Sequence, residues 1–196
     1  MSTLSLLIPT LNEPFYIPRL ARLKAVLDPQ VEKFKSRVEV HYNDAGRSMT
    51  IGEKRNHLLS RVTTEYFSFI DSDDMVAKNY LSSIFWAMDQ NPDCITFNGW
   101  YTDKGANRQN FVIKLGSKYE ERNRVFYRWP NHLAVMRTSL VRHVKFPHIH
   151  KAEDYNWSKI IHDRKLLKTS VHLDFDLYHY DFDDRKPAYG TSTKVR

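Results

Sequence analysis

The feature that most constrains the fold is a regular alternation of strand and helix patterns over the first hundred residues. Short apolar or alternating runs at residues 4–8, 38–42, 66–70 and 94–97 predict strands. The segments between them, residues 17–27, 51–62 and 77–89, carry apolar side chains at helical spacing. This repeated order is typical of a parallel sheet with helices on both faces. We therefore predict an α/β fold, a three-layer α/β/α sandwich around a mostly parallel central sheet.

The second half of the chain is less regular. Residues 111–115 and 133–136 predict strands, and residues 153–163 predict a helix. No linker separates this half from the first, and 196 residues suit one domain. We expect a single domain with two functional halves, residues 1–98 and 99–196.

Polar residues follow three of the predicted strands, at residues 9–13, 43–46 and 71–74. Ligands of open α/β sheets bind at these carboxyl ends. Asp71, Asp73 and Asp74 place three carboxylates within four residues, and these repel one another unless a cation or basic side chains neutralise them. Carboxylates are typical ligands of Mg²⁺ and Mn²⁺, so the segment predicts a metal site. The alternative is that Asp73 or Asp74 caps the helix expected near Ala77, which would explain only one aspartate.

Several common enzyme classes lack their motifs here. The sequence contains no Gly-x-x-x-x-Gly-Lys-Ser/Thr loop, no Gly-x-Gly-x-x-Gly loop and no Gly-x-Ser-x-Gly turn. A calcium loop starting at Asp71 would need glycine and glutamate where Val76 and Ser82 stand. Cys94 lies within a predicted strand, where an inert buried thiol is expected. P-loop, dinucleotide-binding and serine or cysteine hydrolase functions are therefore not supported.

Charge is distributed unevenly along the chain. Residues 1–98 hold 11 basic and 12 acidic side chains, whereas residues 99–196 hold 19 and 11. The excess lies between Lys104 and Lys168 and favours a polyanionic partner such as DNA or a phosphorylated glycan. A solvated basic surface is the alternative. The single cysteine, the lack of a basic leader and the lack of a 20-residue apolar run predict a cytoplasmic protein without a membrane span.

Five segments, in order, resemble the family 2 glycosyltransferases with the GT-A fold. They are residues 6–13 (LLIPTLNE), 43–46 (NDAG), 52–56 (GEKRN), 69–74 (FIDSDD) and 152–157 (AEDYNW). The resemblance covers roughly residues 4–165. Ala45 and Ala152 depart from it, because the family usually has glycine or an acidic residue at the first position and commonly glycine at the second.

The resemblance implies that residues 1–98 bind a nucleotide-sugar donor, with a UDP-sugar expected first. It implies a Mn²⁺ or Mg²⁺ ion on Asp73 and Asp71, with His179 as a further ligand in competition with His150 and His172. A divalent ion there would stabilise the departing diphosphate. The donor-binding residues implied are Pro9, Thr10, Asn12, Glu13, Asp44, Lys54, Arg55, Asp71 and Ser72.

The resemblance assigns acceptor binding and the catalytic base to residues 99–196. Asp154 is the expected base and Glu153 the alternative. A single base opposite the leaving group predicts inversion at the anomeric carbon. Trp129, Asn131 and His132 precede this pair along the chain, and we expect them at the acceptor site.

The acceptor is an expectation from size and charge. Viral transferases that glycosylate modified DNA bases are similarly soluble, compact and basic, so we expect a hydroxymethylated base in DNA, modified in the host cytoplasm. A cell-surface saccharide or its lipid-linked precursor is the alternative. Two other classes remain open: an aspartate-nucleophile phosphatase, which also has a strand ending in Asp-x-Asp, and a basic nucleic-acid-binding module without catalysis.

Overall fold

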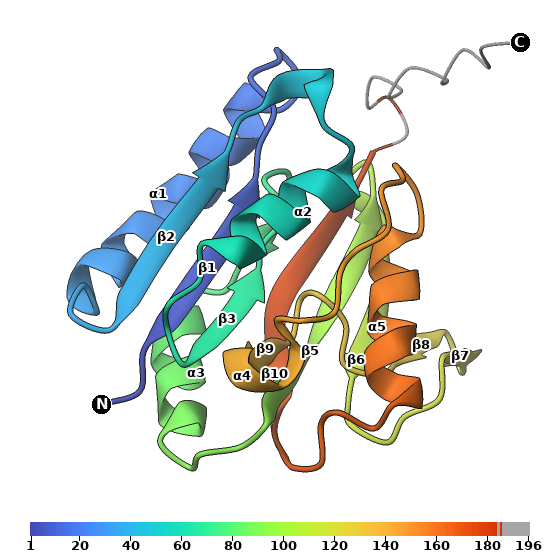
Figure 1. The fold of residues 1–196 in the computed structure, drawn as a ribbon. Coiled ribbons are helices and arrows are strands. Elements are labelled where there is room, and N and C mark those ends of the chain that lie inside the picture. Colours follow the sequence, from blue (N-terminus) through green and yellow to red (C-terminus); the bar gives the residue numbers. More distant parts are fainter. Residues whose placement is uncertain (184, 186–196) are drawn as a thin grey trace, which may run out of the picture.

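The computed structural model describes residues 1–183 and 185, and their centre is a sheet whose strands mostly run in one direction (Figure 1). The middle strands, side by side, are β2 (Val38–Asn43), β1 (Leu4–Pro9), β3 (Tyr66–Phe69), β9 (Val135–Arg137), β5 (Cys94–Asp103) and β10 (Ser170–Phe182). Only β9 among these is antiparallel to its neighbours. The mostly parallel central sheet predicted from the strand–helix order is thus confirmed.

Helices cover both faces of the sheet, which makes three layers. Helix α1 (Ile17–Lys33) contacts α3 (Tyr80–Met88) on one face, and α2 (Ile51–Ser60) contacts α5 (Glu153–Asp163) on the other (Figure 1). A short helix, α4 (Thr138–Val141), follows β9. None of the helices in the described part of the chain has the length and apolar character needed to cross a bilayer.

The second half of the chain extends the sheet beyond β5. The added strands are β6 (Ala106–Ile113), β8 (Val125–Arg128) and β7 (Glu120–Arg122), while β4 (Met75–Val76) pairs with β10. Strand β9 pairs with the start of β5 and β6 pairs with its later part, so these two strands share one side of β5. The chain from β8 to β9, residues 129–134, connects them at this junction and reaches β3, where the Phe69 amide donates to the His132 carbonyl at 3.1 Å.

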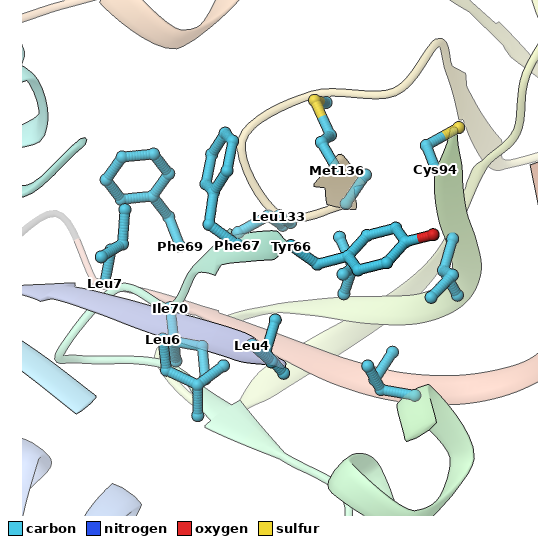
Figure 2. Packing of buried hydrophobic residues seen from close by; sticks show 14 of the residues in the cluster. Leu4, Leu6, Leu7, Tyr66, Phe67, Phe69, Ile70, Cys94, Leu133 and Met136 are labelled. Carbon is cyan, nitrogen blue, oxygen red and sulfur yellow. The ribbon is translucent and has the colours of Figure 1, made fainter. Parts of the chain in front are cut away.

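One apolar core unites the halves, and Figure 2 shows its centre around β1 and β3. All six residues of β1 and all four of β3 are buried, as expected for strands covered on both faces. Leu4, Phe67 and Met136 belong to the same cluster of buried side chains as Tyr178 of the last strand. The described residues therefore form a single domain.

The structure corrects one element that was predicted from the sequence. Helix α3 begins at Tyr80, with Asn79 at its N-cap position, so neither Asp73 nor Asp74 caps it. Met75 and Val76 form β4 instead of leading into the helix. The helix predicted over residues 153–163 is confirmed with those bounds.

Candidate active site

A cleft of about 900 Å³ opens where β1 and β3 end and α5 begins. This is the edge at which α/β sheets bind ligands, and the volume is typical of a ligand site. Many of the residues that the sequence predicted to be functional line it together. They are Pro9, Thr10, Lys54, Arg55, Asp71, Ser72, Asp73, Asn131, His132, Glu153 and Asp154.

The three neighbouring aspartates after β3 have different surroundings. Asp74 is fully buried, and its carboxylate accepts hydrogen bonds from the Tyr178 hydroxyl at 2.8 Å and from the Asp181 amide at 3.0 Å. The Tyr178 oxygen also accepts from the Asp71 amide at 3.1 Å. All three line the cleft, but Asp74 is committed to anchoring the loop to β10, which leaves Asp71 and Asp73 as candidate ligands.

A buried guanidinium joins this loop to α5. Arg55 pairs with Asp71 at 2.8 Å and with Glu153 at 3.0 Å, and only 4% of its side chain is exposed. Although burial opposes it, the charges of Asp71, Glu153 and Asp154 raise the pKa of Arg55 above its ordinary value. Arg55 therefore stays positive and holds two acidic segments together.

The two acidic residues that open α5 are not equivalent. Burial raises the pKa of Glu153, against the opposing effect of Arg55, and only 7% of its side chain is exposed. The side chain of Asp154 is 35% exposed and lies 3.4 Å from the Nδ1 atom of His132. The other ring nitrogen of His132, Nε2, lies 3.4 Å from Asp71. Asp154 is thus the more accessible carboxylate, and the imidazole of His132 connects it to Asp71.

Two residues of α2 fix the position of this acidic pair, although neither was predicted to be functional. The side-chain amide of Asn56 donates to the Phe146 carbonyl at 2.8 Å and accepts from the Phe146 amide at 2.9 Å. At Gly52 a Cβ atom would stand 1.9 Å from the carbonyl oxygen of Pro147. Only glycine permits this approach, so the segment that leads into α5 packs directly against α2.

Three residues expected to bind the donor do not line the cleft. Asn12 and Asp44 are exposed. Glu13 forms an ion pair with Arg47 at 2.6 Å, which links the loops that follow β1 and β2. Hydrogen bonding to Arg47 lowers the pKa of the Glu13 carboxyl. These residues stay predictions for the donor site, and the geometry supports Thr10 and Lys54 more directly.

His179 does not reach the cleft. Its ring stacks on Trp100 at a centroid distance of 4.9 Å, and its Nε2 atom lies 2.6 Å from the Thr102 hydroxyl. Successive side chains of a strand point to opposite faces. Because Tyr178 contacts Asp74 and Tyr180 lines the cleft, His179 between them points away.

His179 is therefore removed from the predicted metal ligands, and Asp71 and Asp73 remain. Of the two competing histidines, His150 lines the cleft, whereas His172 lies outside it and contacts the Thr96 hydroxyl at 3.0 Å. Across the residues that the structure describes, no three His, Cys, Asp or Glu side chains form a group that could hold an ion. A metal at this loop would need most of its ligands from elsewhere.

Trp129 also differs from its expected role at the acceptor site. It is buried, and its indole nitrogen donates to the Ser158 hydroxyl at 3.1 Å. Tyr119 and Arg128 line the cleft instead. Sequence patterns did not indicate either residue, because Tyr119 precedes the three-residue strand β7 and Arg128 ends the four-residue strand β8, and both strands are too short to give a periodic pattern.

The fold and the site define the class of the protein, which is that of glycosyltransferases with the GT-A fold. Residues 22–149 match the family model described as glycosyl transferase family 2. The chain belongs to that family. A comparison with curated protein sequences finds no match.

Solved structures of TarS from S. aureus share the fold. TarS 1–349 in complex with UDP-GlcNAc aligns with a TM-score of 0.63 and 17% identity over 95% of this chain. The same protein in complex with UDP aligns with a TM-score of 0.62 and 19% identity over 92% of this chain. The chain spans 60% of those structures and 37% of a longer TarS structure, which aligns with a TM-score of 0.61 and 16% identity over 92% of this chain.

Proposed function

We propose that the protein transfers a sugar from a UDP-sugar to an acceptor hydroxyl with inversion of configuration. The observation that carries this is the placement of Asp71 and Asp73 in the same cleft as Asp154, which His132 connects to Asp71. Membership of glycosyl transferase family 2 supports the chemistry. The related fold of TarS, which was solved with UDP-GlcNAc and with UDP, supports the choice of nucleotide.

The donor set suits a Mn²⁺ or Mg²⁺ ion that is only partly held by protein. Mg²⁺ commonly takes one or two carboxylates and completes its shell with water and substrate phosphates. Asp73 and Asp71 provide such a pair in the cleft, with Asp71 also neutralised by Arg55. When bound, the ion would supply positive charge that stabilises the departing diphosphate.

Asp154 is the proposed base. The acceptor oxygen attacks the anomeric carbon, and the bond from this carbon to the diphosphate oxygen breaks with its electron pair leaving on UDP. The acceptor proton passes to the Asp154 carboxylate. Glu153 cannot take this role equally well, because its carboxylate is buried against Arg55. Attack from the face opposite the leaving group inverts the anomeric centre.

For the acceptor we propose a hydroxymethylated base in DNA, which would place the reaction in the cytoplasm, that of the host if the protein is viral. The basic excess between Lys104 and Lys168 supports a polyanion. A cell-surface saccharide or its lipid-linked precursor is the alternative acceptor. A non-catalytic nucleic-acid-binding module would instead bind DNA in a salt-dependent manner that Asp73→Asn leaves unchanged.

Release of UDP from UDP-sugars, with UDP-GlcNAc first, tests the proposal. We expect Asp154→Asn to lower the rate roughly 10²–10⁴-fold, the usual contribution of a general base, with unchanged affinity for UDP. Asp163→Asn is the matched control, because this aspartate is exposed at the other end of α5. Wild-type rates in Asp154→Asn would show that the base lies elsewhere.

A further inference from the structure

We propose that Tyr119 and Arg128 form an acceptor subsite for a ring that carries a phosphate group. The inference rests on the proposed glycosyl transfer and names the chemistry of its acceptor. A nucleotide and a phosphorylated sugar share this chemistry. The subsite lies in the same cleft as Asp154.

Tyr119 is an exposed aromatic ring on a rigid support. Its side chain belongs to a residue that is 40% exposed, and it lies against buried Trp129 at a centroid distance of 4.9 Å. Trp129 stacks in turn on His162 at 4.5 Å and bonds to Ser158. A ring held this firmly loses little conformational entropy when a sugar or base packs on it.

The Tyr119 ring packs against the helix that carries the proposed base. Tyr155, which follows Asp154 on α5, packs edge-on against Tyr119 at 5.1 Å. Burial raises the pKa of Tyr119, the charge and hydrogen bond of Arg128 oppose this, and the charge of Asp154 adds to it. Tyr119 thus lies against the element that carries the proposed base, whereas the aspartates expected to hold the diphosphate lie on the loop after β3.

The positive charges near Tyr119 indicate an anionic acceptor. The guanidinium of Arg128 lies 4.5 Å from the ring centroid of Tyr119, and Lys151 lines the cleft immediately before α5. Neither cation forms a salt bridge within residues 1–183 and 185. Arginine binds phosphate through charge-assisted hydrogen bonds. A phosphate bound by Arg128 would bring the attached ring to Tyr119, in the cleft that Asp154 also lines.

Two matched pairs of probes test the subsite by calorimetry in the presence of saturating UDP and Mn²⁺. They are 5-hydroxymethyl-2′-deoxycytidine with and without its 5′-phosphate, and glucose 6-phosphate with glucose. In at least one pair we expect the phosphorylated member to bind about tenfold tighter, as a charge-assisted hydrogen bond provides. The pair that shows the preference identifies the source of the phosphate.

Variants of the two residues then test which side chain causes the preference for the phosphorylated probe. Arg128→Gln should abolish it, and Tyr119→Ala should weaken both members of the pair, whereas Tyr119→Phe should retain binding. Arg142→Gln, at an exposed arginine outside the cleft, is the control. A preference that survives in Arg128→Gln would overturn the assignment, and so would equal binding within both pairs.

UDP affinity, measured on the same proteins, separates this inference from the proposed function. Unchanged UDP affinity in Arg128→Gln, together with a lost phosphate preference, supports the subsite. Reduced UDP affinity in that variant would place Arg128 at the donor and overturn the subsite alone. A wild-type protein that binds no UDP would overturn the proposed function and this inference together.

Discussion

At the scale of single residues, the centre of the cleft is a series of contacting polar side chains that runs from Glu153 through Arg55, Asp71 and His132 to Asp154. Burying a guanidinium is costly unless its carboxylate partners remain in place. The same contacts keep the loop after β3 and the start of α5 at a fixed separation. The proposed donor loop and the proposed base are therefore positioned by one set of side chains.

His132 is the member of this series that can be removed without leaving a buried charge. We expect His132→Asn to lower kcat for UDP release about 10–100-fold, because small misplacements of a base have effects of this size. KM for the donor should stay unchanged, and thermal unfolding should show an intact fold. His143→Asn, at an exposed histidine, is the control. An unaltered kcat in His132→Asn would mean that Asp154 is positioned without the imidazole.

Ala152 is one position at which the sequence departs from its family. It precedes α5 with a φ of 59°, in the left-handed region where a Cβ atom is unfavourable. Replacement by glycine, which the family commonly has there, should stabilise the protein by roughly 0.5–1 kcal/mol after the extra entropy of the unfolded chain is counted. Urea unfolding of Ala152→Gly measures this, and a loss of stability would contradict it.

At the scale of secondary-structure elements, β10 is the main support of the loop after β3. It runs parallel to β5 along its whole length and pairs with β4 directly after the three aspartates. The hydroxyl of Tyr178 contacts two of those aspartates, at the Asp71 amide and the Asp74 carboxylate. The last described strand thus fixes the wall of the cleft formed by the first half of the chain.

Tyr178→Phe tests this support. The variant leaves the buried Asp74 carboxylate and the Asp71 amide each with one hydrogen bond fewer, which should cost about 1–3 kcal/mol. For a chain of this length, each kcal/mol corresponds to a fall in Tm of roughly 2–4 °C. Differential scanning calorimetry gives the shift. Tyr42→Phe, on the outer strand β2, should leave Tm almost unchanged, and an equal loss in both variants would argue against a special role for Tyr178.

The elements that sequence patterns predicted correctly lie mainly in the strand–helix alternation of the first hundred residues, with the helix at residues 153–163 in addition. Residues 153–163 and the strands at both ends of α1 have clear spacing and were found. Strand β10 was missed, although Val171, Leu173, Phe175 and Leu177 alternate with polar residues along it. Strands β4, β7 and β8 have two to four residues and no pattern to detect.

At the scale of the whole molecule, the cleft requires both halves of the chain. Thr10 and Asp73 come from the first half, while Arg128 and Asp154 come from the second. The sequence motifs predicted which segments meet, because carboxyl ends of neighbouring strands share one edge. They could not predict that Asp74 faces β10, that His179 points away or that Tyr119 reaches the cleft, since these depend on pairing between segments far apart in the chain.

Thermal unfolding with UDP, in the presence and absence of Mn²⁺, tests most directly whether this cleft binds a nucleotide-sugar donor. UDP at about 100 times its Kd should stabilise the fold by about 2.7 kcal/mol, or roughly 5–10 °C. We predict that this shift requires Mn²⁺ and disappears in Asp73→Asn. GDP, CDP and ADP serve as controls for the identity of the nucleobase. No shift with any nucleotide, beside salt-dependent DNA binding that survives Asp73→Asn, would contradict a transferase and favour the non-catalytic binding module.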